Sequence, residues 1–94
     1  MKTILLDFRM IKTREQVHEY LAERLDFPYY YGKNLDSLYD MLTDINEDVC
    51  LEIVIPGKSE FSEFYEYLFQ IEQVLQDAYQ DNPCLSIQYR RSEE

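Results

Sequence analysis

The 94-residue chain is poor in the residues that typify loop-rich, fibrous or disulfide-stabilised proteins, with two glycines, three prolines and two cysteines. The scarcity of glycine and proline argues against a loop-rich or fibrous protein. Cys50 and Cys84 both lie beside apolar runs, where a free thiol behaves as a small hydrophobic side chain. No apolar run approaches the length of a membrane span, and no export signal is visible. We therefore expect a protein of the reducing cytoplasm that folds without disulfides.

Basic residues are also scarce, because nine lysines and arginines face 19 acids and leave a net charge of -10. The imbalance is local. Residues 34–83 carry twelve acids and one base, Lys58, whereas residues 1–33 carry five acids and six bases. An acidic surface repels nucleic acid and anionic membrane and speeds the encounter with a basic partner. Direct binding to nucleic acid or to a membrane is therefore disfavoured.

The apolar residues indicate a packed globule. The hydrophobic fraction is 46% and the aromatic fraction 15%, and the length fits a single domain over residues 1–94. Short apolar runs rich in β-branched residues predict strands. These runs cover residues 3–8, 49–55 and 84–89.

Capping residues and helical spacing predict the helices. Thr13 and the glutamine three residues later have the spacing of a capping box, which predicts a first helix near residues 14–25. Asn34 is a good N-cap for a second helix. Ser59 is a candidate cap for an apolar helical stripe that runs to about residue 81, as one helix or as two.

This order of elements, β-α-α-β-α(α)-β, favours parallel strands joined by right-handed crossovers. The predicted fold class is therefore α/β, with a small three-stranded parallel sheet packed with three to four helices.

Groups suited to catalysis or metal binding are few. The only histidine, His18, falls beside the apolar stripe of the first predicted helix, which favours a surface or boundary residue over a catalytic base. No second histidine or close cysteine pair supplies zinc-ligand spacing, and Gly32 and Gly57 stand alone rather than in a phosphate-binding loop. We expect no enzyme activity, no metal and no cofactor. A carboxylate-based hydrolase that uses Asp36 and Asp40 is an alternative, disfavoured because such pairs work in a desolvated cleft.

The second predicted helix carries Asp36, Asp40 and Asp44 on one face, at spacing i, i+4 and i+8. Like charges at this spacing repel one another, and no base stands four residues away to neutralise them. Tyrosines crowd one end of the same predicted surface, at Tyr29, Tyr30, Tyr31 and Tyr39. Rigid aromatic side chains beside charges are typical of protein interfaces. The pattern favours a module that binds a basic protein, and the alternative is an ordinary solvated helix face.

The segment from Pro28 to Thr43 has the pattern P-x-Y-Y-G-x-N-L-D-x-L-x-D-x-L-T. This long pattern resembles the signature segment of the barstar family, the bacterial intracellular ribonuclease inhibitors. The rest of the chain agrees with that family in the order and length of its elements, whereas residues 56–70 show little detailed similarity.

The resemblance implies roles for individual residues in blocking the active site of a ribonuclease. Asp40 matches the aspartate that enters the phosphate site of the nuclease, Asp36 matches an acid that pairs with an arginine, and Tyr30 matches the tyrosine that packs on the catalytic histidine. The other residues that match contacts of the family, or the flanking acids of its later helix, are Gly32, Asn34, Thr43, Asp77 and Asp81.

The chain departs from the family pattern at four positions close to these residues, two of which, Tyr29 and Lys33, bracket the motif. Tyr39 stands where the family prototype has tryptophan, and Asp77 stands where glutamate is usual. Lys33 puts a positive charge next to the acids. These departures bear on the choice of target more than on the mode of binding.

The sequence therefore predicts a cytoplasmic, non-catalytic inhibitor that binds a basic ribonuclease or a nuclease toxin, as an immunity protein, and is monomeric when free. The alternative is an acidic interaction module whose basic partner is not a nuclease, such as a regulator or a ribosomal protein. Periodicity and charge indicate only a basic partner, and the nuclease follows from the resemblance.

Overall fold

The strands of this computed structural model, which describes residues 2–56 and 63–90, form a parallel sheet in the order β1-β2-β3. Their bounds are β1 Lys2–Asp7, β2 Val49–Val54 and β3 Leu85–Arg90. The helices are α1 Arg14–Leu25, α2 Leu35–Thr43 and α3 Glu63–Asp81. The order β-α-α-β-α-β confirms the predicted fold class, and each strand lies within one residue of its predicted bounds.

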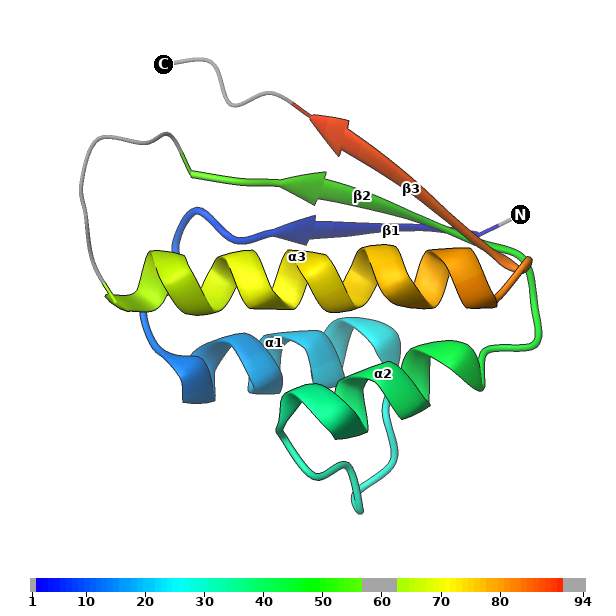
Figure 1. Cartoon of the computed structure of the whole chain (residues 1–94), viewed down its shortest axis with the longest axis horizontal. Helices are drawn as coiled ribbons and strands as arrows, with labels where there is room; N and C mark the ends of the chain where they lie inside the picture. The colour runs from blue at the N-terminus through cyan, green and yellow to red at the C-terminus, as the bar shows by residue number, and fades with distance from the viewer. Residues whose placement is uncertain (1, 57–62, 91–94) are drawn as a thin grey trace.

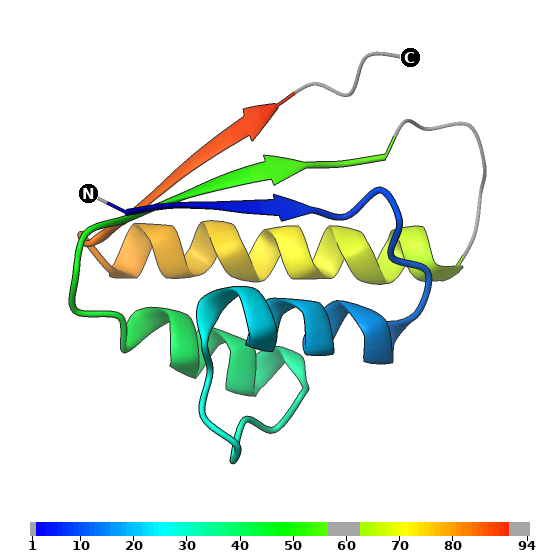
Figure 2. The same cartoon turned by 180° about the vertical axis from the view of Figure 1, so that it is seen from behind.

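The helices of the described chain lie on one side of the sheet (Figures 1 and 2). This arrangement follows from the topology, because right-handed crossovers that advance in one direction place their helices on the same face. The side chains of Ile4, Leu51 and Ile87 lie in register across the helix-facing side of the sheet, where Ile4 and Leu51 belong to the core and the partly buried Ile87 packs against it. α2 lies farthest from the sheet and packs against α3, so its outer face is exposed (Figure 1).

The caps of α1 and α2 form largely as the sequence predicts. The Thr13 hydroxyl accepts from the Gln16 N–H at 3.1 Å, and the Asn34 Oδ1 atom accepts from the Ser37 N–H at 2.8 Å. The return bond of the predicted capping box differs, since the Gln16 side chain accepts from the Lys12 N–H at 2.8 Å rather than from Thr13.

The stripe that ends at residue 81 is a single helix over the described residues, which resolves the choice between one helix and two. Ser59, the candidate cap, lies outside the described residues. No helix in the described part of the chain combines the length and the apolar character needed to cross a bilayer.

The prediction that His18 is a surface or boundary residue is wrong, because the side chain is buried, with 2% of the residue exposed. Both ring nitrogens have a hydrogen-bonding partner, at the hydroxyls of Tyr31 and Tyr67. These partners offset the desolvation of the polar ring. Tyr67 lies 49 residues away along the chain, so local periodicity carries no sign of this pairing.

Candidate functional site

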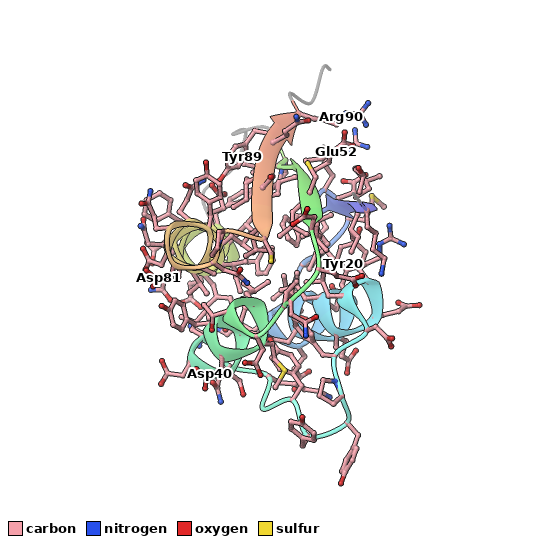
Figure 3. All side chains as sticks on the ribbon, turned by 90° about the vertical axis from the view of Figure 1, so that its right-hand side faces the viewer. Tyr20, Asp40, Glu52, Asp81, Tyr89 and Arg90 are labelled. Atoms are coloured by element: carbon pink, nitrogen blue, oxygen red, sulfur yellow. The ribbon has the colours of Figure 1, made fainter. Side chains whose placement is uncertain are left out.

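The exposed face of α2 joins the last turns of α3 to form one acidic surface. Asp36 and Asp40 are exposed on α2, and Asp77 and Asp81 are exposed on α3. Figure 3 looks along the helices and shows Asp40 and Asp81 on these neighbouring helices. We call the four aspartates together with Tyr39 the acidic face.

Tyr39 lies at the centre of the acidic face. Its hydroxyl donates a hydrogen bond to the Asp81 carboxylate, across 42 residues of sequence. This bond raises the pKa of Tyr39, and burial and the negative charges of Asp81, Asp77 and Asp40 raise the pKa further. The hydrogen bond between Tyr39 and Asp81 shows that the packed helices α2 and α3 bring these two residues together. The bond also restricts the rotation of the tyrosine ring.

The acids of this surface lack a basic ion-pair partner among residues 2–56 and 63–90. Within the described ranges, no ion pair joins Asp36, Asp40, Asp77 or Asp81 to a base. Lys33, which was expected to add a positive charge next to these acids, forms an ion pair with Glu19 of α1 instead. Its ammonium lies 4.0 Å from the Glu19 carboxylate. The acidic face therefore keeps its negative charge available for an external cation.

The loop between α1 and α2 presents two of its three consecutive tyrosines. Tyr29 is 99% exposed and Tyr30 is 67% exposed, and their rings meet edge to face with centroids 5.6 Å apart. Tyr31 is 6% exposed and belongs to the core. The prediction that all three tyrosines lie on the surface is therefore wrong for Tyr31, whose hydroxyl bonds to His18 inside the protein.

Gly32 and Asn34 connect the loop to the start of α2. The Gly32 N–H donates to the Ser37 Oγ atom at 3.0 Å, and the Asn34 Nδ2 atom donates to the Gly32 carbonyl at 3.3 Å. A Cβ atom at position 32 would lie 2.6 Å from Ser37 Oγ, closer than real Cβ contacts allow. The structure thus gives these two predicted site residues a role in shaping the loop, and their contact with a partner stays a prediction.

Thr43 has a similar internal role at the other end of α2. Its hydroxyl bonds to the Tyr39 carbonyl at 3.0 Å and to the Asp40 carbonyl at 3.2 Å, so it turns back onto the helix. Asp44 follows as the C-cap residue of the same helix. Whether Thr43 also touches a partner stays a prediction.

Sequence reasoning missed two buried polar residues, and one of them positions the acidic face. Asn82 is buried, and its amide donates to the carbonyls of Leu42 and Ile45 at 2.9 and 3.0 Å. It therefore ties the end of α2 to the end of α3. Tyr67 is buried against His18, and its spacing of four residues from Ile71 is a helical signal that could have placed it in the core.

The described residues contain no cluster of three or more histidine, cysteine, aspartate or glutamate side chains arranged to hold a metal ion.

The fold and this surface define a small acidic α/β domain that presents its second helix outward. The chain belongs to the barstar family, because the family model described as Barstar (barnase inhibitor) matches residues 1–89. It is also similar to a Bacillus subtilis (strain 168) protein named "Putative ribonuclease inhibitor YrdF". The two are 37% identical over 83 residues, which cover 86% of this chain and 89% of the relative. These comparisons confirm the predicted family and support a role as a ribonuclease inhibitor.

Proposed function

We propose that this protein is a non-catalytic inhibitor that blocks the active site of a cognate ribonuclease or nuclease toxin. Asp36 and Asp40 would occupy the positions of substrate phosphates. The observation that carries the proposal is the acidic face itself: exposed carboxylates on a capped helix, with no ion pair to a base among the described residues.

A ribonuclease binds phosphates with cationic side chains, so carboxylates placed at the same spacing compete for those cations. Hydrogen bonds between arginine and carboxylate are short and about twice as strong as neutral ones. Because Asp36 and Asp40 stand one turn apart on α2, their separation is set before the partner arrives. Such preorganisation removes the entropic cost that a flexible acidic loop would incur on binding.

The tyrosines supply the apolar part of the proposed interface. Tyr30 projects from the loop, and Tyr39 is held by its hydrogen bond to Asp81. Tyrosine adds large contact area with few rotatable bonds, which suits it to interface hot spots. Asp77 lies one helical turn before Asp81 and would meet a cation at the rim of the nuclease site.

The charge of the whole segment would speed the encounter. Residues 34–83 hold twelve acids against one base, so their field attracts a cationic nuclease from a distance. Association should therefore slow as salt is added, because the Debye length falls from about 10 Å at 0.1 M to about 3 Å at 1 M. In this proposal the protein acts in the cytoplasm as a monomeric immunity protein.

The test is inhibition of RNA cleavage by two kinds of probe: barnase, and any ribonuclease encoded beside the gene for this chain. Stoichiometric inhibition of either one supports the proposal. Failure to inhibit both at micromolar concentrations would overturn it. Binding to a basic protein without nuclease activity would then favour the alternative of a general acidic interaction module.

A further inference from the structure

Buried hydrogen bonds through the His18 side chain connect α1, α3 and the loop between α1 and α2. The His18 Nδ1 atom lies 2.7 Å from the Tyr31 hydroxyl, and the His18 Nε2 atom lies 2.6 Å from the Tyr67 hydroxyl. His18 belongs to α1, Tyr31 to the loop between α1 and α2, and Tyr67 to α3. The residues are 2%, 6% and 7% exposed, so water is largely excluded from these bonds.

Tyr31 is the point at which the loop is held to the body of the protein. Its ring packs on Phe27 with centroids 4.8 Å apart, and its N–H donates to the Pro28 carbonyl at 3.0 Å. The residues on either side, Tyr30 and Gly32, are both exposed. A single buried side chain thus separates two residues that we place at the nuclease interface.

We propose that His18 and Tyr67 are positioning residues of the inhibitor, which hold Tyr31 and so fix the loop that presents Tyr29 and Tyr30. The expected effect on nuclease binding rests on the proposed function. The expected effect on the order of the loop depends only on the hydrogen bonds from Tyr31 through His18 to Tyr67, and it can be measured without any nuclease. Neither His18 nor Tyr67 would touch the partner.

The imidazole ring decides which tyrosine hydroxyl donates and which accepts in these two hydrogen bonds. A neutral histidine has one N–H donor and one nitrogen acceptor, so one phenol donates to the ring and the other accepts from it. A protonated ring donates on both sides, and the phenol that formerly donated must turn its hydrogen to another acceptor. Since both phenols are buried, such an acceptor is not freely supplied by water.

The surroundings of His18 also favour the neutral ring. Burial lowers the pKa of His18 below its ordinary value of 6.5, and the charge of Lys33 from the loop lowers it further. The guanidinium of Arg14 lies 4.5 Å from the centroid of the Tyr67 ring, which adds a second cation near the hydrogen bonds of His18. Among the described residues, the phenols of Tyr31 and Tyr67 face the ring directly, and burial raises the pKa of both.

The sign of the pH effect follows from this lowered pKa. The unfolded chain takes up a proton near pH 6.5, whereas the folded chain does so at lower pH. The stabilisation from neutral His18 is therefore complete above about pH 6.5 and is lost as the pH falls from there to the folded pKa. The order of the loop should decline over the same interval.

The first test is amide hydrogen exchange in the segment Tyr31–Gly32, whose two N–H groups donate hydrogen bonds within the loop, at pH 7.5 in Tyr67→Phe, which removes one hydroxyl and keeps the ring. We expect exchange in this segment to rise about tenfold, as for the loss of one buried hydrogen bond. Tyr79→Phe is the matched control, because Tyr79 is an exposed tyrosine on the same helix, and it should change nothing. Unchanged exchange in Tyr67→Phe would overturn the inference.

The second test uses His18→Gln, since glutamine can donate and accept hydrogen bonds and does not titrate. Between pH 7.5 and 5.5, exchange at the Tyr31 and Gly32 amides, corrected for its intrinsic pH dependence, should rise in the wild type and stay level in this variant. Parallel profiles for the two proteins would contradict the role given to the neutral ring.

The third test measures affinity for the inhibited ribonuclease, which Tyr67→Phe should weaken about tenfold while Tyr79→Phe leaves it intact. A looser loop with unchanged affinity would refute the positioning role. A wild-type protein that binds no ribonuclease would contradict the proposed function instead. The exchange experiments would still decide whether the hydrogen bonds of His18 to Tyr31 and Tyr67 order the loop.

Discussion

The acidic face should reduce the stability of the free protein, and Asp40→Asn measures by how much. Asp40 lies four residues from Asp36 and four from Asp44, so two like-charge pairs meet at this position. Each such pair costs about 0.2–0.5 kcal/mol on a helix. Asparagine and aspartate have similar helix propensities, so the substitution changes charge more than backbone preference. The variant should therefore be more stable than the wild type by about 0.5–1 kcal/mol at low ionic strength.

Urea unfolding is the appropriate assay. With a slope of about 1–2 kcal/mol per molar for a protein of this size, the midpoint should rise by roughly half a molar. The gain should disappear in 1 M salt, where the Debye length of about 3 Å screens pairs one helical turn apart. Asp48→Asn is the control, since it makes the same change at an exposed acid outside the helices, where no like-charge pair at i,i+4 of a helix is removed.

An unchanged or lower midpoint for Asp40→Asn at low salt would refute the view that these acids repel one another. A gain that persists in 1 M salt would point to propensity or packing instead. A clear, salt-sensitive gain would mean that the protein carries these charges at a cost to its own stability, as expected of residues that serve a partner.

Two further predictions concern the loop and Tyr39. Gly32→Ala should destabilise the protein by about 1 kcal/mol, because the added Cβ would lie 2.6 Å from the Ser37 Oγ atom and force that hydroxyl away from the bond it accepts from the Gly32 N–H. Combining it with Ser37→Ala should recover part of the loss in urea unfolding, and equal losses for Gly32→Ala with and without Ser37→Ala would reject this clash. Asp81→Asn should lower the pKa of Tyr39, measured by NMR titration of the labelled ring, because the hydrogen bond to that carboxylate is the main cause of the elevation. The bond stabilises the protein below about pH 10, the ordinary tyrosine value, and this stabilisation is lost as the pH rises through the raised pKa; an unaltered pKa in Asp81→Asn would disprove the assignment.

The sequence predicts the local parts of this site well. The N-cap at Asn34, the start of α2 and the positions of Asp36 and Asp40 depend on residues within one or two helical turns. The parallel order of the strands follows from alternating strands and helices and from the handedness of crossovers. Such features need no knowledge of what lies across the fold.

The parts that sequence reasoning missed depend on distant partners. His18 is buried because phenols 13 and 49 residues away bond to its ring. Tyr39 meets Asp81 across 42 residues, and Lys33 of the loop before α2 pairs with Glu19 of α1. Periodicity describes which face a residue occupies and says nothing about the side chain that faces it. The resemblance to the barstar family added the nuclease, which charge and periodicity alone do not identify.

The central claim is that carboxylates of α2, at defined positions, bind a ribonuclease active site. Its most direct test is the Kd of the wild type, Asp40→Ala and Asp44→Ala for the ribonuclease that the wild type inhibits, measured by calorimetry at a fixed salt concentration. We predict that Asp40→Ala weakens binding by about 2 kcal/mol or more, roughly thirtyfold, as for an interface hot spot. Asp44→Ala, which removes the C-cap acid farther from the exposed tyrosines, should have a much smaller effect. An unchanged Kd for Asp40→Ala, or equal losses for the two variants, would contradict the claim.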